Sequence, residues 1–262
     1  KESDLILLLG RKQDLIIGYA KPPTFSNKTH IIQIDPSAAE IGRNRGVSVG
    51  IVGSIDKILD QLADEAAKYT WEKGPWITRL NDIRTRHQDD LEALTGIESP
   101  MHAMSVHKAL REFLRPDDYL IFDGGDYCHF GRAYIPALEP KKWLYVSTLG
   151  MLGTALPTAL AAKLAHPEKR VVMLTGDGSF GFNAMEFDTA IRHNLNITAI
   201  LGNDAAWGID RQIQINVYGK PVATDLLPTR YDKVVESLGG HGEFVQTPAE
   251  LPKAIRKALH SG

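Results

Sequence analysis

Two short acidic motifs carry the most specific chemistry in this sequence. Gly176-Asp177-Gly178 follows one apolar run and Asn203-Asp204 follows another, with 24 residues between Gly178 and Asn203. Each run has the length of a buried strand, and the segment between them has a helical pattern that Asn183 is expected to cap. The strands of such a unit are parallel. Both aspartates therefore fall at the carboxyl edge of one sheet, where open α/β sheets bind ligands.

Two carboxylates at one sheet edge suit a hard divalent cation. Mg²⁺ takes few protein oxygens and completes its shell with phosphate and water. Gly176 and Gly178 allow close approach of the backbone, and amides from Ser179 onward can donate to phosphate oxygens. A Gly-Asp-Gly motif alone is also compatible with a simple turn, but the spacing and the second aspartate favour a phosphate site.

The elements around these motifs indicate an α/β protein with two doubly wound parallel-sheet domains. Apolar strand-length runs alternate with amphipathic helix patterns along nearly the whole chain. We predict a first domain over residues 1–75, a linker over 76–99 with one polar helical stretch, and a second domain over 100–262. Strands in the second domain are expected at 119–122, 143–146, 171–174, 197–201 and 243–246.

Bulk properties exclude some classes of function. The 262 residues have a net charge of −2, which argues against nucleic-acid partners and a membrane-binding basic face. The apolar runs are too short to span a bilayer. The single cysteine rules out an internal disulfide and favours a cytoplasmic protein. The chain lacks an initial Met and stops after a helical pattern, so we expect a fragment or one of two pieces.

The Gly-Asp-Gly…Asn-Asp pattern resembles that of thiamine diphosphate (ThDP)-dependent enzymes, in which Asn-Asn follows Gly-Asp-Gly after some two dozen residues. The resemblance implies ThDP held through Mg²⁺ by Asp177, Asp204 and the main-chain carbonyl of Ala206. Asp204 stands where the family has Asn, which adds negative charge and predicts an altered metal affinity. Residues 1–75 would be the second half of the family's middle domain, and 100–262 its diphosphate-binding domain, truncated at the C-terminal end.

Two further segments match this family. Ser147-Thr-Leu-Gly-Met-Leu-Gly153 resembles the segment that grips the aminopyrimidine, so the Gly150 carbonyl and the Leu152 amide would bind the ring. The Leu152 side chain would support the thiazolium. Asp123-Gly-Gly-Asp-Tyr-Cys-His129 resembles the turn that contacts diphosphate and substrate, which makes Gly125 and Asp126 cofactor contacts. Relatives usually have a neutral polar residue at position 126. Cys128 and His129 either face the substrate or are structural.

The substrate class is indicated by Met185-Glu-Phe-Asp-Thr189, by Asn203-Asp-Ala-Ala-Trp-Gly208 and by Gln33-Ile-Asp-Pro36. These look most like benzaldehyde lyase and the 2-hydroxyacyl-CoA lyases, and less like oxalyl-CoA decarboxylase and acetolactate synthase. Asp35 would lie near an adenine nucleotide (ADP, CoA or FAD) in the middle domain, or would only cap a turn. The substrate pocket would be walled by residues that otherwise serve helix packing, namely Trp207, Ile209, Gln212 and Ile213.

The resemblance implies a C–C lyase or carboligase acting on a small molecule such as a 2-hydroxyacyl-CoA. In the family, the Glu that activates the aminopyrimidine lies on a pyrimidine-binding domain and is contributed across a subunit interface. These 262 residues do not contain that domain, so we predict an N-terminal segment or partner subunit and a homo- or hetero-oligomer, such as a dimer of dimers. Three alternatives stay open: an acetolactate synthase-like decarboxylating ligase, a non-catalytic subunit, and a Mg²⁺-dependent phosphohydrolase.

Overall fold

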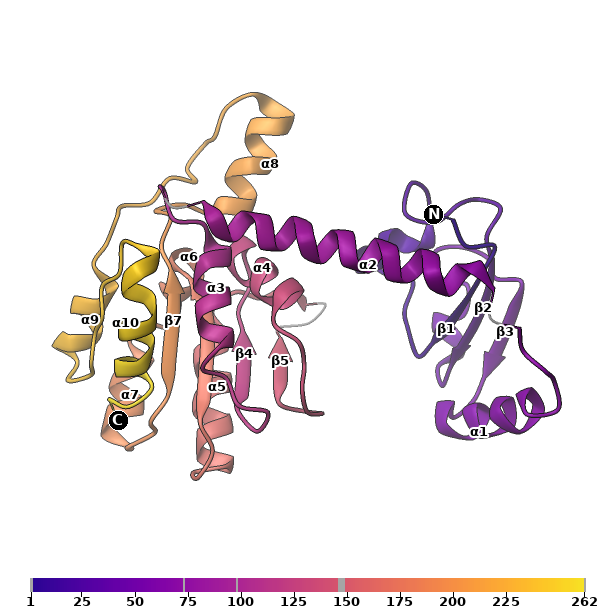
Figure 1. Cartoon of the computed structure of the whole chain (residues 1–262), viewed down its shortest axis with the longest axis horizontal. Coiled ribbons are helices and arrows are strands. Elements are labelled where there is room, and N and C mark those ends of the chain that lie inside the picture. Colours follow the sequence, from indigo (N-terminus) through magenta and orange to yellow (C-terminus); the bar gives the residue numbers. More distant parts are fainter. Residues whose placement is uncertain (1, 73, 98, 146–148, 262) are drawn as a thin grey trace. The chain divides into compact units, whose positions relative to one another are not determined.

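A computed structural model describes residues 2–72, 74–97, 99–145 and 149–261. The chain divides into two compact units, Lys1–Ile77 and Thr78–Gly262 (Figure 1). Both contain a parallel sheet with helices, which confirms the predicted fold class. No helix in the described ranges is both long and apolar enough to cross a bilayer.

The first unit is built on three parallel strands, β1 (Leu5–Leu9), β2 (His30–Asp35) and β3 (Val49–Val52), in that order. Ile31 and Ile34 of the central strand are fully buried. Two 3₁₀ turns, η1 (Leu15–Ala20) and η2 (Ala38–Glu40), lie in the connections, and α1 (Ile55–Ala66) follows β3. The buried amide of Gln33 donates to the Glu40 carbonyl at 3.0 Å and thereby fixes the turn after β2.

The predicted linker contains more helix than its polar composition suggested. A single helix, α2 (Pro75–Ala93), is followed by the short turn η3 (Leu94–Gly96). Only Leu91 of α2 is buried. A helix with one buried side chain has a weak apolar periodicity, which is why the sequence indicated only a polar helical stretch within the linker.

The second unit has a four-stranded parallel sheet in the order β5-β4-β6-β7. Its strands are β4 (Tyr119–Phe122), β5 (Trp143–Tyr145), β6 (Val171–Gly176) and β7 (Thr198–Gly202). The helices in the described residues are α3 (Ala103–Arg111), α4 (Asp126–Tyr134), α5 (Ala155–Ala165), α6 (Asp177–Phe180), α7 (Glu186–Arg192), α8 (Gly208–Tyr218), α9 (Tyr231–Ser237) and α10 (Leu251–Ala258).

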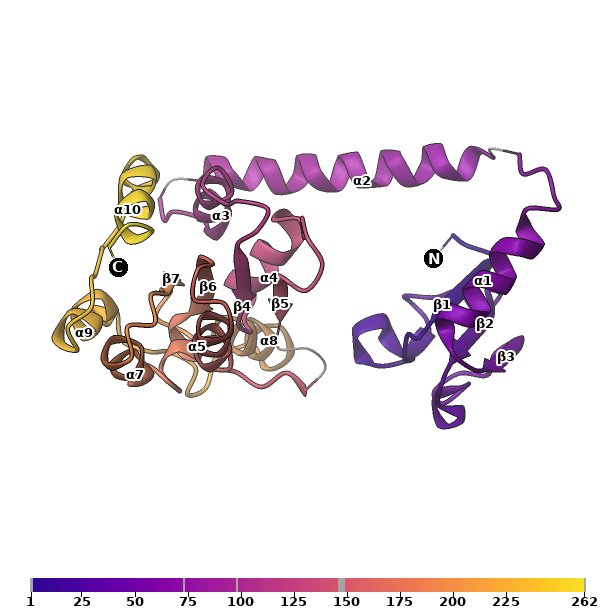
Figure 2. The ribbon, with the colours of Figure 1, turned by 90° about the horizontal axis from the view of Figure 1, so that it is seen from below.

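Alternate residues of β6 build two separate cores, one on each face of this sheet. Val171 and Met173 pack with α5 and α7, whereas Val172 and Leu174 pack with α3, α4 and α10. Figure 2 shows α3 and α10 on one side of the sheet and α5 and α7 on the other. A central strand buried on both faces reads as a continuous apolar run, which is how the sequence predicted it.

Two local predictions are wrong in the second unit, where a capping box formed by Thr247 and Glu250 begins η5 (Pro248–Glu250). The strand predicted at 243–246 is wrong, because these described residues pair with no neighbouring strand. Asn183 does not cap a helix: its side-chain amide donates to the Gly153 carbonyl at 2.6 Å, and Met185 is the N-cap of α7.

Candidate cofactor site

The two acidic motifs leave the sheet at the same level. Strands β6 and β7 pair in parallel with Gly176 opposite Gly202. Asp177 begins α6 directly after β6, and Asp204 lies two residues beyond the end of β7. Asp177 is only 2 % exposed, whereas Asp204 is exposed. The register of the ladder therefore brings both carboxylates to one edge of the sheet.

The two carboxylates interact with each other. Burial, and next to it the charge of Asp204, raises the pKa of Asp177 to about 6. The Oδ2 atom of Asp177 is buried and has no hydrogen-bond partner in the part of the chain that the structure describes. A buried carboxylate oxygen without a donor costs free energy, and a cation is the partner that such an oxygen favours.

A third carboxylate, from Asp126 at the start of α4, faces the same space. A Cβ atom added to Gly208 would lie 3.0 Å from Oδ2 of Asp204 and 3.4 Å from Oδ2 of Asp126. Burial raises the pKa of Asp126; the charge of His129 opposes this shift, and those of Asp204 and Asp210 add to it. The edge of the sheet thus carries more negative charge than the two motifs alone.

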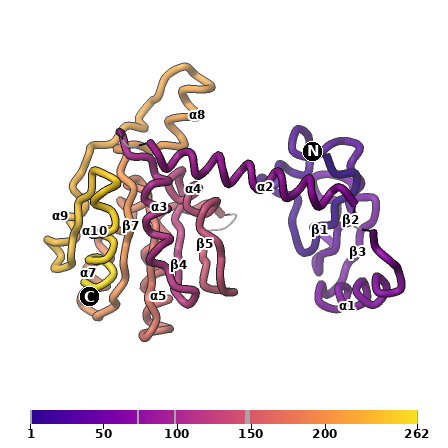
Figure 3. The backbone as a smooth tube through the Cα atoms, viewed as in Figure 1, coloured from indigo at the N-terminus to yellow at the C-terminus, as the bar shows by residue number. Residues whose placement is uncertain are grey.

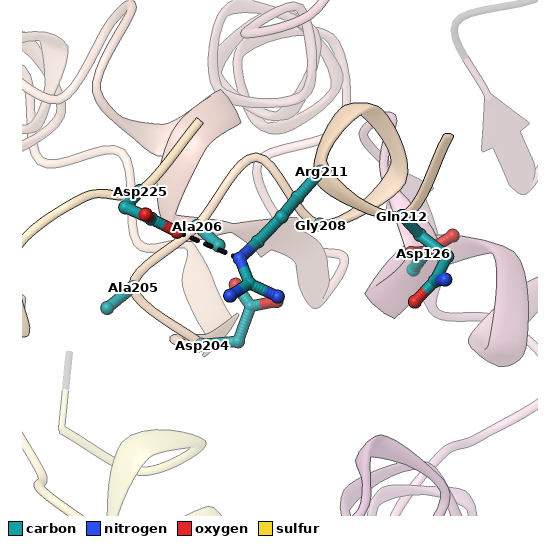
Figure 4. Close-up of a pocket in the computed structure, with 8 residues that line it drawn as sticks. All are labelled: Asp126, Asp204, Ala205, Ala206, Gly208, Arg211, Gln212 and Asp225. Atoms are coloured by element: carbon teal, nitrogen blue, oxygen red, sulfur yellow. Dashed lines mark hydrogen bonds and ion pairs between the residues drawn. The ribbon is translucent and has the colours of Figure 1, made fainter. Parts of the chain in front are cut away.

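Asp126 and Asp204 line a cavity of about 490 Å³ (Figure 4). Helix α8 contributes three residues to its wall, and Figure 4 shows Arg211 extending from this helix toward the loop that carries Asp204. The lining is predominantly polar and contains Asp126, Asp204, Ala205, Ala206, Gly208, Arg211, Gln212 and Asp225.

A short antiparallel contact holds the loop after β7. The Trp207 amide donates to the Thr224 carbonyl at 2.8 Å, and the Leu226 amide donates to the Ala205 carbonyl at 2.7 Å. The backbone leaves β7, forms α8 and returns to this contact before α9 (Figure 3). Ala206 lies opposite Asp225 in the resulting bridge. These two residues form the non-hydrogen-bonded pair, so the Ala206 carbonyl is available to a ligand.

Asp123, at the end of β4, anchors the segment predicted to grip the aminopyrimidine. Its Oδ1 atom accepts from the Gly124 and Gly153 amides at 2.8 and 2.9 Å, and Oδ2 accepts from the Ala155 amide at 3.2 Å. Burial raises its pKa, and the amide donors oppose that shift. Sequence reasoning missed this role, although an aspartate at a strand end before Gly-Gly is a signal for it.

Leu152 and Gly150 lie in the loop that Asp123 holds. The Leu152 side chain occupies the space beside Gly124 where a Cβ atom would otherwise lie. Gly150 is exposed and has φ +64°, a conformation that favours glycine. Ser147, at the start of the matched segment, and Val146, the last residue of the predicted strand 143–146, lie outside the described residues.

Of the two alternatives for Cys128, a substrate-facing residue or a structural one, its burial favours the structural one. Its side chain is fully buried in α4 against the sheet, and its thiol donates to the Leu174 carbonyl at 3.2 Å. Burial raises the pKa of this thiol to about 12. The helix turns the third residue of α4 toward the core, whereas Asp126 and His129 face outward. Ser179 is also buried.

The predicted wall residues of α8 and its N-cap are not all in the cavity. Gln212 lines it. Trp207 instead packs beside the Gly-Asp-Gly loop: its Cε3 atom lies 2.9 Å from the position of a Cβ on Gly178, and its ring meets Phe182 edge-on at 5.8 Å. Ile209 is half-buried, Ile213 is 52 % exposed, and neither belongs to the described lining.

Both units of the chain match models of known protein families. Residues 123–262 match the C-terminal TPP-binding domain of thiamine pyrophosphate enzymes, and residues 1–62 match their central domain. The chain belongs to the thiamine pyrophosphate enzyme family. Thiamine pyrophosphate is ThDP, so the cofactor predicted from the two motifs is the one that this family binds.

The similar proteins include an acetolactate synthase and 2-hydroxyacyl-CoA lyases. The chain is 37 % identical over its full length to a probable acetolactate synthase of Mycobacterium bovis, covering 47 % of that protein. It is 30 % and 28 % identical to 2-hydroxyacyl-CoA lyase 1 of Mus musculus and Homo sapiens, with 99 % and 98 % of the chain aligned. The chain spans about half the length of these relatives.

Proposed function

We propose that this chain binds the diphosphate of ThDP through Mg²⁺ held by Asp177, Asp204 and the Ala206 carbonyl. The observation that carries the proposal is the buried, unpartnered Oδ2 atom of Asp177 beside a second carboxylate. The described residues contain no cluster of three His, Cys, Asp or Glu side chains suited to a metal. Two carboxylates and one carbonyl, completed by phosphate and water, are the donor set that Mg²⁺ accepts.

The remaining segments of the site orient the cofactor. ThDP, when bound, supplies a carbanion and an electron sink for C–C bond cleavage. The turn at Gly125 and Asp126 borders the diphosphate, and the Ser179 amide donates to it. The Gly150 carbonyl and the Leu152 amide would hold the aminopyrimidine, and the Leu152 side chain would support the thiazolium. Asp123 holds this loop against the sheet through three backbone amides.

The reaction of the whole protein is a C–C lyase or carboligase reaction of the 2-hydroxyacyl-CoA lyase type. The names of several relatives support this reading. The second candidate is an acetolactate synthase-like decarboxylating ligase, which the 37 % identical relative supports. Release of formyl-CoA from a 2-hydroxyacyl-CoA identifies the lyase, and acetolactate formed from pyruvate identifies the synthase.

Further components complete the active protein. A Glu from a pyrimidine-binding segment or subunit activates the aminopyrimidine, within a homo- or hetero-oligomer. A chain without that Glu is inactive, and a non-catalytic subunit is the alternative if no such segment exists.

An adenine nucleotide or flavin in the first unit has weaker support, because Asp35 is buried and accepts from the Ser37 amide at 2.8 Å. A cytoplasmic location stays a prediction.

Calorimetric titration with ThDP tests the proposal directly. We expect binding that requires Mg²⁺ and disappears with EDTA, and recovery of intact ThDP from the bound fraction. Asp90→Asn, in the exposed part of α2, is the matched control for Asp177→Asn and leaves ThDP binding unchanged. Metal-independent binding, or hydrolysis of the diphosphate, contradicts the assignment and favours the phosphohydrolase alternative.

A further inference from the structure

The cavity at the sheet edge carries an excess of negative charge. Its described lining contains the carboxylates of Asp126, Asp204 and Asp225, and the buried carboxylate of Asp177 lies beside Asp204. Mg²⁺ offsets two of these charges, but the diphosphate that comes with it adds more. Two of the lining aspartates, at positions 126 and 204, stand where the family pattern has a neutral residue. A bound diphosphate therefore needs another cation nearby.

Arg211 is the single Lys or Arg in the described lining of this cavity. It lies in the first turn of α8, where its amide donates to the Trp207 carbonyl at 2.8 Å. Its Nε atom donates to Oδ1 of Asp225 at 2.8 Å. Its two terminal nitrogens, Nη1 and Nη2, have no hydrogen-bond or ion-pair partner in the described part of the chain.

The ion pair with Asp225 is of a kind that exchanges readily. Arg211 is 43 % exposed and Asp225 is 69 % exposed, and one hydrogen bond joins them. Exposed pairs of this type contribute about 0–1 kcal/mol to stability in general. Another oxyanion can therefore replace Asp225 at little cost.

The position of the Arg211–Asp225 ion pair indicates which oxyanion would replace Asp225. The backbone bridge sets Asp225 opposite Ala206, whose carbonyl is the proposed third metal ligand. A guanidinium held at Asp225 therefore lies beside the metal loop, within the cavity that also contains Asp204 (Figure 4). The planar fork of Nη1 and Nη2 matches two oxygens of one phosphate group.

We propose that Arg211 binds the terminal phosphate of ThDP. Asp225 holds Arg211 in place until the phosphate replaces Asp225 as its partner. The inference rests on the proposed function. It assigns to this chain a side-chain cation that offsets the acidic residues at positions 126 and 204. It also explains why an extended arginine lies over a loop that already carries the metal ligands.

Four variants of the complete protein test this inference by calorimetric titration with ThDP at saturating Mg²⁺. We expect Arg211→Gln to raise the Kd about 10- to 100-fold, as for loss of a charge-assisted hydrogen-bonded pair, and Arg211→Lys to raise it less because lysine lacks the fork. Arg192→Gln is the matched control, since Arg192 is an exposed helical arginine whose Nε donates to Asp188. It should leave the Kd unchanged.

Asp225→Asn separates phosphate binding from a structural role of the ion pair. If Asp225 competes with the phosphate, this variant binds ThDP as tightly as the wild type or more tightly. If the pair only holds the loop, Asp225→Asn weakens binding as much as Arg211→Gln does, and the inference is overturned. Mg²⁺-pyrophosphate, used as a competitor, should lose affinity for Arg211→Gln in parallel with ThDP, whereas thiamine should not.

The outcomes distinguish this inference from the proposed function. Wild-type protein that binds Mg²⁺ and ThDP, together with an Arg211→Gln variant of equal affinity, overturns the role of Arg211 and leaves the cofactor site intact. Wild-type protein that binds no ThDP overturns both proposals.

Discussion

A buried histidine predicts that the second unit loses stability in mild acid. His107 of α3 is fully buried, and its Nε2 donates to the Tyr127 carbonyl at 2.7 Å. Its Nδ1 atom has no partner in the described structure. Burial lowers the pKa of His107 to about 4. Through Tyr127 this side chain supports the first turn of α4, directly after the turn that borders the proposed diphosphate site.

The size of the loss in unfolding free energy follows from proton linkage. In the unfolded chain the imidazole titrates near its ordinary value of 6.5, so the unfolded state takes up the proton first as the pH falls. The stabilisation is fully present above pH 6.5 and is lost between pH 6.5 and pH 4. The loss is about 2 kcal/mol at pH 5 and about 3 kcal/mol at pH 4 for a single group with these two pKa values.

Urea unfolding at pH 7 and pH 5 measures this loss. Replacing Trp71 and Trp76 by Phe confines the tryptophan fluorescence to Trp143 and Trp207 of the second unit. His107→Gln retains a donor for the Tyr127 carbonyl but cannot be protonated in this range, so its stability should fall less between the two pH values. The difference from wild type should be about 2 kcal/mol.

The control variant is His87→Gln, on the exposed part of α2, which should retain the wild-type pH dependence. The raised pKa of Asp177 acts in the opposite direction as the pH falls below about 6, but it is common to every variant and cancels in the difference. Equal pH dependence of wild type and His107→Gln would refute the reasoning.

Three further predictions concern the site and the core beneath it. Asp177→Asn should abolish Mg²⁺-dependent ThDP binding in calorimetry and raise the melting temperature of the metal-free protein, because a buried unpaired carboxylate is removed. Retained binding would contradict its role as a ligand. Asp123→Asn should cost about 1–3 kcal/mol in urea unfolding, since an amide NH₂ then faces backbone donors; an unchanged free energy of unfolding would contradict the anchoring role. Cys128 should react with a thiol reagent at pH 8 only in denaturant, and rapid labelling of native protein would contradict its burial.

The strands of the second unit were predictable because burial on both faces leaves an uninterrupted apolar run. Val171–Leu174 could be recognised in this way, and the Gly-Asp motif then marked the end of the strand. The segment 243–246, Glu-Phe-Val-Gln, has only two apolar residues between polar ones and forms no strand. Its Val245 packs against the core and its Glu243 binds Lys257 and His241, so an apolar centre with polar ends arises here without strand pairing. A single sequence cannot distinguish these cases, because strand pairing depends on distant segments.

The site was predictable only where function depends on motif spacing. Asp177, Asp204 and Gly125 follow strand ends, and the parallel register brings such ends together. Which side of a helix faces the core and which faces the cavity was less predictable. Cys128 and Asp126 are two positions apart in α4, and the direction of the helix axis decides that one is buried and the other borders the cavity. Ile213 lies near Gln212, yet only Gln212 lines the cavity.

Charge balance is the property of this site that no local motif contains. Asp126, Asp204, Arg211 and Asp225 come from three segments, and each is unremarkable within its own. Their interaction arises because Tyr127 in the first turn of α4 packs against Gly202 at the end of β7, and because the chain returns after α8 to pair with the loop that carries Asp204. An Asp in place of Asn at position 204 adds one negative charge to this group, beside the proposed diphosphate site. Arg211 lies in the same cavity lining as Asp204 and is a cation that offsets part of that charge. Asp204 and Arg211, which line one cavity, are therefore better understood as one electrostatic unit than as two independent features.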